Sequence, residues 1–386
     1  MPKVSIIVPV YNVERYFDQC AQSLFYQTCR DIEIIFINDG SPDNCPAMCD
    51  EYEKQHPELV RVVHQKNCGQ NVAWNTGLSV ATGEWICFVD SDDWAEPNMI
   101  ETMLKYAENK EAEANPVGAV ALARPLFATQ NTAADAEDIR EANAKQLATQ
   151  DAADIHVFGH YKEYKNKMLS RVLFEYELTH IEKSNFIYHK HKLIPTEAWG
   201  KLFRRSLIEN NNLSFYPDHF HHEDVIFNLK AFNNAKKVCL HPECLYHYRM
   251  VNSGFMKRWD EKRMDIYMLY INRYFEFIDS HFKDNENRMM KHKHLLDVLI
   301  YWIAEHYGDK RSGYTKKQTA GFIKQTFENE PFKSAIENYP IRKLKCSQKI
   351  SAVLLKMRLY RLWIALLNFF KKIKTFINKN NYIGFE

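Results

Sequence analysis

The sequence predicts an α/β protein with a mostly parallel central sheet flanked by helices. Two observations carry this prediction. Short runs rich in β-branched apolar residues recur near the start of the chain, at Val4–Val10, Ile32–Ile37, Val60–Val63 and Trp85–Val89. Stretches with the apolar spacing of helices separate them, such as Tyr16–Tyr26 and Pro46–Gln55. Nearly continuous apolar strands that alternate with helices are typical of a parallel sheet covered on both faces.

The rest of the chain is predicted to add a less regular half and a helical extension. A strand is expected at Asp154–Tyr161, a helix from about Glu223–Asp224, and a short strand pair around Lys237–Arg249. Residues 111–153 are rich in alanine and poor in aromatic residues, which indicates an insertion between sheet elements. From Asp260 the pattern is helical and increasingly basic. The predicted parts are therefore 1–110, 111–153, 154–260 and 261–386.

Composition places the chain among folded proteins of a reducing compartment. The 386 residues are 46% hydrophobic and 26% charged, as in folded domains. The nine cysteines show no paired CxxC spacing, which argues against a disulfide framework or a zinc ribbon. The first apolar run is too short for a signal peptide, and no run approaches the roughly 20 apolar residues of a spanning helix. We expect a cytoplasmic protein, at most attached to one face of a membrane.

Basic charge is concentrated at the C-terminal end. From Ile341 onward, 11 Lys and Arg residues stand against a single acid, Glu386, whereas the preceding residues carry 40 basic and 48 acidic side chains. On a helical wheel of ~100° per residue, one side collects Lys345, Lys349, Lys356, Lys371 and Lys374. With Trp363, Phe369 and Phe370, they predict that residues 341–380 form a helix lying on an anionic bilayer. The alternative is a helix packed on the rest of the protein with a solvated basic face. Nucleic acid is not an expected partner, because no recognised module accompanies the charge.

Polar residues follow three of the predicted strands directly, at Tyr11–Asn12, Asn38–Ser41 and Asp90–Asp93. In open parallel sheets, ligands bind beyond the carboxyl ends of the strands. Side chains alternate along an extended segment, so Asp90 and Asp92 should point to one side. Paired carboxylate oxygens suit Mg²⁺ or Mn²⁺, which in turn binds a diphosphate. The sequence therefore predicts a metal and diphosphate site along one rim of the sheet.

Four motifs in this order resemble glycosyltransferase family 2. They read PVYNVERYF from Pro9, INDGSPDN from Ile37, NCGQNVAWNTGL from Asn67 and GEWICFVDSDDW from Gly83. The later segments WGKLFRR and HHEDVIF are similar to the acceptor side of that family. The resemblance implies a GT-A (nucleotide-diphospho-sugar transferase) fold, a nucleotide-sugar donor, a divalent metal and inversion at the anomeric carbon. Neither the alanine-rich insertion nor the basic tail belongs to the common pattern.

The resemblance also implies roles on the donor side. Pro9, Tyr11 and Glu14 would pack against the nucleotide base. Asp39 would bind the uracil ring, which makes UDP the expected nucleotide. Asp92 would ligate the metal and Asp90 would face the metal or the ribose, while Asp93 would reach hydroxyls of the donor sugar. The other expected donor-side residues are Asn12, Lys66, Asn67, Gly69, Asn75 and Ser91.

On the acceptor side, Asp224 in His222-Glu223-Asp224 would be the catalytic base. Candidate acceptor-side residues are Trp199, Glu223 and His222. The histidines of this segment could suggest zinc, but adjacent histidines rarely point at one metal. We therefore interpret them as lining the acceptor groove or as exposed.

One position departs from the family pattern. The family usually has Ala-Arg-Asn where this chain has Ala73-Trp74-Asn75, so an indole replaces a cation. Either Lys66 takes over the role of that arginine, or the arginine is structural in the family.

The prediction for function is an inverting, metal-dependent glycosyltransferase. It would move a hexose or N-acetylhexosamine from a UDP-sugar to a hydroxyl of a lipid-linked surface glycan, at the cytoplasmic face of a bacterial inner membrane. The resemblance is strongest to the branch that builds capsule, exopolysaccharide and lipopolysaccharide. The alternatives are a sugar-nucleotide pyrophosphorylase, a glycoside hydrolase with two carboxylates, and a catalytically degenerate UDP-sugar-binding homologue or scaffold. Trp74 is the one feature that favours the last of these.

Overall fold

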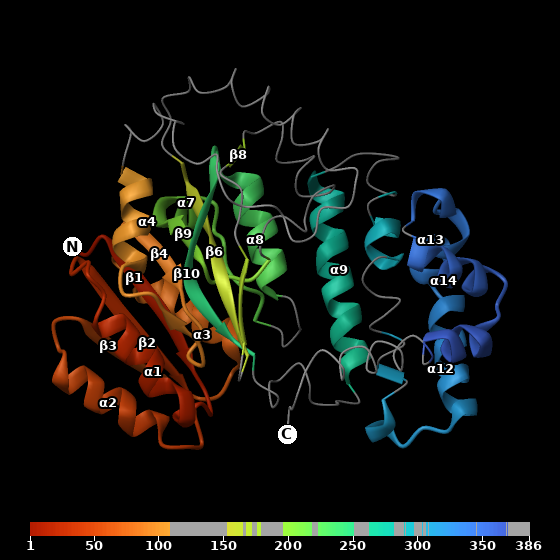
Figure 1. Ribbon diagram of the computed structural model, residues 1–386, viewed down its shortest axis with the longest axis horizontal. Helices are drawn as coiled ribbons and strands as arrows, with labels where there is room; N and C mark the ends of the chain where they lie inside the picture. The colour runs from red at the N-terminus through yellow and green to blue at the C-terminus, as the bar shows by residue number, and fades with distance from the viewer. Residues whose placement is uncertain are drawn as a thin grey trace. The chain divides into compact units, whose positions relative to one another are not determined.

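The computed structural model divides the chain into two compact units, Met1–Val251 and Asn252–Glu386 (Figure 1). The residues it describes are 1–108, 153–164, 167–171, 176–178, 196–217, 223–250, 262–281, 289, 291–296, 303, 306–307, 309–344, 346–367 and 369. Apart from Ala153, the predicted insertion at 111–153 lies outside these residues, and so do His219, His221, His222 and Phe370. The four predicted parts of the chain stay a prediction.

The first unit contains a mixed sheet with the strand order β3-β2-β1-β4-β9-β6-β10-β5, in which β7 pairs with β6 and β8 with β10 (Figure 1). The strands are β1 (Val4–Val10), β2 (Ile32–Asp39), β3 (Val60–Gln65), β4 (Trp85–Phe88), β5 (Trp94–Ala95), β6 (Ile155–Tyr164), β7 (Lys167–Arg171), β8 (Tyr176–Leu178), β9 (Lys201–Arg204) and β10 (Val238–Arg249). The first four predicted strands are therefore confirmed. Strands β3, β2, β1 and β4 are parallel neighbours, so their carboxyl ends share one rim.

One predicted element is wrong. The strand pair expected around Lys237–Arg249 is a single long strand, β10, which runs parallel to β6. Its register shifts between His241 and Cys244 and again between Cys244 and Tyr246. Pro242 has no N–H to give to a ladder, and a bulge is the place in a sheet where proline is tolerated. The interruption therefore bends one strand without making a turn.

Helices cover both faces of the parallel strands. The helices of the first unit are α1 (Glu14–Phe25), α2 (Cys45–Gln55), α3 (Gln70–Val80), α4 (Met99–Glu108), α7 (Arg205–Asn210) and α8 (Glu223–Asn234). Side chains of α1 and α2 share one core with Ile6 and Val8 of β1. Ile7 points to the other face, where α3 lies so close that a Cβ on Gly77 would stand 2.3 Å from Ile7 Cγ2. Glycine is needed at this contact because only its backbone fits.

All the secondary structure described in the second unit is helical, which confirms the predicted helical extension. Its elements are α9 (Arg263–His281), η4 (Lys310–Ser312), α12 (Lys316–Glu328), α13 (Phe332–Asn338), η5 (Ile341–Lys343) and α14 (Cys346–Lys356), and residues 360–367 are also helical. Among the helices described here, none is both long and apolar enough to cross a membrane.

The C-terminal helix differs from the prediction in two ways. It is not continuous, because the chain turns at Arg358, whose φ is 57°. Trp363, expected to face the bilayer, is fully buried, and its ring meets that of Phe327 at 5.4 Å and 89°. Burying a large aromatic ring stabilises a small helical core, and a helical wheel does not show which face of a helix packs against that core.

Candidate active site

The predicted rim begins with the end of β2. Asp39 is almost fully buried, and its Oδ1 accepts hydrogen bonds from Gln65 Nε2 (2.7 Å) and Cys68 N (2.8 Å). Its Oδ2 accepts from Gly69 N at 2.8 Å, and Gly69 has a φ of 89°. Asp39 therefore holds residues 66–69 against the sheet. A carboxylate has about four acceptor sites, so one remains for the N–H of a ligand. Lys66 and Asn67 are exposed on the held loop.

The loop after β1 exposes Tyr11 and Asn12. Tyr11 is 47% exposed, whereas Pro9 is buried within β1. Asn12 has a φ of 54°, and its N–H donates to Ser41 Oγ at 2.6 Å. Glu14 is engaged elsewhere, because its Oε2 accepts from Asn44 N (2.8 Å) while its own N–H donates to Asp43 Oδ2 (2.9 Å). This reciprocal clasp joins the starts of α1 and α2. Pro9 has no surface open to a base in this position, whereas Glu14 is exposed and its expected contact with a base stays a prediction.

Helix α3 carries structural residues where donor contacts were expected. Asn75 Nδ2 donates to the carbonyl oxygen of Phe215 (2.8 Å), and its Oδ1 accepts from Phe215 N (2.9 Å). Trp74 is 4% exposed, and its ring lies 4.5 Å from Phe215 and 6.0 Å from Phe88. The indole thus joins an aromatic core. Asn75 clamps a loop instead of facing the donor, and no cation of α3 replaces the family's arginine.

The carboxylates after β4 occupy two different environments. Asp90 Oδ1 accepts from Gln70 Nε2 at 3.0 Å, and Ser91 is buried. Asp93 has no exposed surface, because its Oδ2 accepts from Tyr246 Oη (2.7 Å) and its Oδ1 from Arg249 N (2.7 Å). Tyr246 Oη also accepts from Asp90 N at 3.0 Å. The expected contact of Asp93 with sugar hydroxyls does not fit this burial, so we assign it the fixing of the Asp90–Asp93 turn.

Arg249, at the end of β10, is a site residue that sequence reasoning missed. Its Nε donates to the carbonyl oxygen of Asp92 at 2.7 Å, and its guanidinium lies 4.5 Å from the ring of Trp94. Burial raises the pKa of Asp92, and the charge of Arg249 opposes that rise. Antiparallel pairing of Trp94 with His247 brings β10 to this turn. No local motif predicts a strand pairing across about 150 residues. Only the structure shows that Tyr246 and Arg249 lie at this turn.

The structure brings the start of α8 to the same carboxylates. Burial first, and then the charge of Glu197, raise the pKa of Asp224 to about 7, while Lys201 lowers it. The pKa of Glu223 rises to about 8, through burial and then through Asp224 and Asp90. Burial, Asp92 and Asp224 raise the pKa of Asp90 well above its usual range. The two predicted acidic segments therefore form one electrostatically coupled cluster.

A buried lysine and a buried asparagine hold this cluster together. Lys201 is fully buried, and its Nζ donates to the carbonyl oxygens of Glu197 and Trp199. Asn228 Nδ2 donates to carbonyl oxygens of Thr196 (2.6 Å), Glu197 (3.2 Å) and Asp224 (2.9 Å). The loop before β9 is thereby fixed to the first turn of α8.

Trp199, expected on the acceptor side, is a core residue. It is 4% exposed and stacks on Tyr246 with ring centroids 4.6 Å apart and planes inclined by 6°. Since Tyr246 holds Asp93 and the backbone of Asp90, Trp199 supports the acidic turn through Tyr246, and its expected place on the acceptor side stays a prediction.

Comparison with known proteins decides the family. The sequence profile described as Glycosyl transferase family 2 matches residues 5–124. EpsH of Bacillus subtilis (strain 168), named as a glycosyltransferase, is 31% identical over 301 residues, which make up 78% of this chain and 74% of EpsH. The chain belongs to glycosyltransferase family 2. EpsJ of the same organism, also named as a glycosyltransferase, is 35% identical over 249 residues, 64% of this chain and 61% of EpsJ. The chain thus spans less than two thirds of EpsJ.

A solved structure confirms the expected fold. S. aureus TarS 1–349 in complex with UDP-GlcNAc superposes with a TM-score of 0.61 at 16% identity, over 96% of this chain and 92% of that one. The likeness shows the GT-A fold alone. Membership of glycosyltransferase family 2 argues against the two alternatives of a sugar-nucleotide pyrophosphorylase and a glycoside hydrolase.

The acidic residues of this glycosyltransferase fit a divalent metal that is shared with a ligand. In the part of the chain that the structure describes, no three His, Cys, Asp or Glu side chains converge as a complete metal site. Mg²⁺ is usually held by one or two carboxylates together with substrate phosphates and water. Asp92 and Asp90 offer hard oxygen donors of that kind, and the raised pKa values of both show that their negative charge is poorly compensated by the protein.

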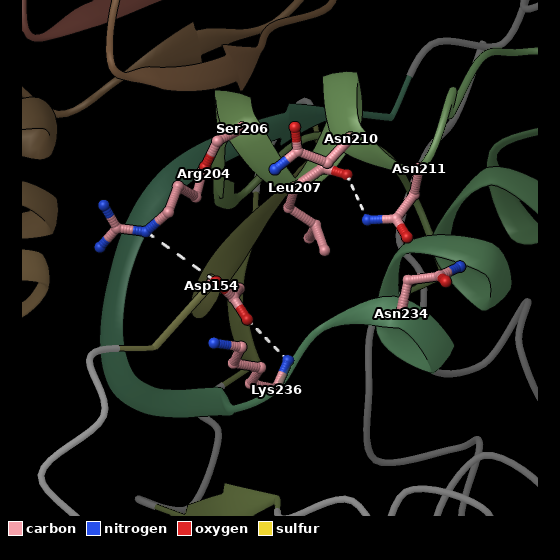
Figure 2. A pocket seen from close by; sticks show the side chains of 8 residues that line it. All are labelled: Asp154, Arg204, Ser206, Leu207, Asn210, Asn211, Asn234 and Lys236. Atoms are coloured by element: carbon pink, nitrogen blue, oxygen red, sulfur yellow. Dashed lines mark hydrogen bonds and ion pairs between the residues drawn. The ribbon is translucent and has the colours of Figure 1, made fainter.

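A cavity of about 360 Å³ lies at the opposite rim of the sheet. Figure 2 shows its lining, where Asp154 Oδ2 accepts from Lys236 N at 2.6 Å and Asp154 pairs with Arg204 at 3.9 Å. Arg204 pairs in the sheet with Trp85, the first residue of β4, so this cavity is at the amino end of the parallel strands. It contains none of the predicted site residues.

Proposed function

We propose that the protein transfers a hexose or an N-acetylhexosamine from a UDP-sugar to a hydroxyl group of a surface glycan, with inversion and with the help of Mg²⁺ or Mn²⁺. The observation that carries this proposal is that Asp90, at the rim of the sheet, lies close enough to both Asp92 and Asp224 for their charges to raise its pKa. This proximity would join the proposed metal and diphosphate edge to Asp224, whose pKa of about 7 suits a general base.

Donor binding is proposed at the ends of β1, β2 and β4. The free acceptor site of Asp39 would take the N–H of a uracil ring, beside the exposed ring of Tyr11. Asp92, with Asp90, would hold the divalent cation, and Lys66 on the neighbouring loop offers a further positive charge. A cation bound there supplies Lewis-acid stabilisation of the negative charge on the leaving diphosphate. The UDP-GlcNAc bound to TarS supports a UDP-sugar as the donor.

Asp224 is proposed as the base. A general base works best when its pKa lies near the pH of the reaction, and burial raises the pKa of Asp224 to about 7. The acceptor hydroxyl loses its proton to Asp224 while its oxygen forms a bond to the anomeric carbon. The bond from that carbon to the diphosphate breaks, and UDP leaves with the electron pair. Attack from the face opposite the leaving group inverts the configuration.

Glu223 has a different proposed role. Its pKa of about 8 keeps it protonated at neutral pH, so that it can donate a hydrogen bond to an acceptor hydroxyl. A protonated Glu223 also reduces the repulsion that an ionised Asp224 experiences from its neighbours.

The proposed acceptor is a lipid-linked glycan of the capsule, exopolysaccharide or lipopolysaccharide type, at the cytoplasmic face of the membrane. The free thiols of the described cysteines support a reducing compartment.

Release of UDP tests the proposal. The protein is incubated with a panel of UDP-sugars in Mn²⁺ or Mg²⁺, with and without EDTA, and with short glycan acceptors. We expect slow hydrolysis of one donor without acceptor, faster release with acceptor, and loss of both with EDTA. A protein that binds UDP and metal but releases UDP from no donor in the presence of any acceptor would be the non-catalytic homologue instead.

A further inference from the structure

The second unit exposes large apolar side chains over one short stretch. Ile350, Val353, Met357, Leu359, Leu362 and Phe369 are each between 39% and 61% exposed, and we call these six residues the apolar corner. Elsewhere in the described chain, such exposure is limited to Met1, Tyr11, Tyr26, Met168 and Leu169, all in the first unit. Single exposed apolar residues are ordinary, whereas six of them within 20 residues of two consecutive helices make this stretch a candidate binding surface.

The corner is one of two apolar faces on the same helices. Ile350 and Val353 of α14 and Met357, directly after its last residue, are spaced i, i+3 and i+7, so they lie on one side of this helix. The other side is buried through residues such as Leu355, and Trp363 is buried in the following helix. The inner faces therefore anchor both helices in the second unit, and the outer faces remain open to solvent.

The turn between the two helices exposes apolar and basic residues together. Leu359 N donates to Leu354 O (2.8 Å) and Arg358 N to Leu355 O (2.9 Å), the paired bonds of a Schellman motif. The motif needs a left-handed residue, and Arg358, with a φ of 57°, stands where glycine is favoured. All four residues from Lys356 to Leu359 are exposed. The turn therefore places the side chain of Arg358 in solvent beside Met357 and Leu359.

The charge of this stretch is of one sign. The sequence has no Asp or Glu between Glu337 and Glu386. Exposed Lys356, Arg358 and Arg361 alternate with apolar residues of the corner in KMRLYRL. Apolar side chains can enter the boundary of a bilayer while neighbouring cations meet anionic headgroups. A second copy of this chain would instead bring Lys356, Arg358 and Arg361 against the same three cations, which electrostatic repulsion opposes.

We propose that the apolar corner, with Lys356, Arg358 and Arg361, binds the surface of an anionic phospholipid bilayer. The contact is a corner between two helices, and it does not use Trp363. The proposal is independent of the donor, the metal and the acceptor proposed above.

Flotation of the full-length protein with vesicles tests this proposal. We expect binding to vesicles that contain phosphatidylglycerol, and weaker binding to pure phosphatidylcholine vesicles or in high salt. Replacing Lys356, Arg358 and Arg361 together by Gln should weaken binding on the order of 100-fold, because each basic residue contributes about fivefold (~1 kcal/mol). Replacing Met357, Leu359 and Leu362 together by Ser should also weaken it, by at least about tenfold.

Matched controls distinguish binding through the apolar corner from nonspecific binding through other exposed apolar side chains. Replacing Tyr26, Met168 and Leu169 by Ser removes equally exposed apolar side chains from the first unit and should leave vesicle binding unchanged. The comparison of anionic with neutral vesicles uses the unmodified protein, so it holds even if a variant folds poorly. Absence of binding to anionic vesicles, or equal binding of wild type and both corner variants, overturns the proposal. So does a dimer in sedimentation that the Ser variant abolishes while vesicles do not bind.

Discussion

Replacing Asp224 by Asn is expected to lower kcat for sugar transfer by about 10²–10⁴-fold, because the amide cannot accept the proton of the acceptor hydroxyl. UDP binding in the presence of metal should stay within about twofold of wild type, since the base contacts the acceptor and not the nucleotide. The variant should fold, because the substitution removes one negative charge from a crowded cluster. Turnover with the preferred donor and UDP binding by calorimetry are the measurements.

The matched control is Glu209→Gln on α7, which removes an exposed carboxylate that pairs with Arg205. This variant should transfer sugar at the wild-type rate. Near-normal turnover of Asp224→Asn would remove Asp224 as the base, whereas loss of UDP binding in that variant would assign it to the donor side.

Replacing Lys201 by Met is expected to move the acidic limb of the pH–activity profile to higher pH by about one unit. The positive charge of Lys201 lowers the pKa of Asp224, so its loss raises that pKa. Because the base must be ionised, activity at pH 6 should fall more than activity at pH 8.5. Removing a charged partner from a buried cluster should also cost about 3–5 kcal/mol of folding stability.

The titration of Asp224 also determines how the stability of Lys201→Met changes with pH. A carboxyl group with a pKa raised by folding destabilises the protein as pH rises from its unfolded pKa toward its folded pKa. Lys201→Met should therefore be less destabilised at pH 5 than at pH 8. Lys230→Met is the control, because Lys230 lies on α8 and donates to the hydroxyl oxygen of Tyr216 at 3.0 Å. A wild-type pH profile for Lys201→Met would show that Lys201 does not act on the base.

The rim of the site could be predicted from the sequence because its parts are local. Strand β1 has the predicted bounds, and each polar group follows its strand directly, so the parallel order of the strands brings Asp39 and Asp90 together. The orientation of individual side chains could not be predicted in this way. Asp93 follows Asp90 by three residues but is fully buried, and Tyr246 and Arg249 of β10 donate hydrogen bonds to both of its oxygens.

Contacts between distant segments also determine the surroundings of several predicted site residues. Glu14 forms a clasp between two helices, Asn75 clamps a loop, and Trp199 supports Tyr246. Each contact joins segments far apart in the chain, so it cannot be predicted from the spacing of residues in the sequence. The role of Lys201 could not be predicted for the same reason. Nothing in the local sequence WGKLFRR indicates that this lysine is fully buried beside carboxylates.

Calorimetric titration of UDP into the protein, with and without Mn²⁺, tests the central claim most directly. The claim is that the edge formed by Asp39 and Asp90–Asp93 binds a nucleoside diphosphate through a metal held at Asp92. Wild type and Asp224→Asn should bind UDP with Mn²⁺ and lose most of that affinity with EDTA, and Asp92→Asn should show little gain from Mn²⁺. Failure of wild type to bind UDP, or equal metal-dependent binding by Asp92→Asn, would contradict the account.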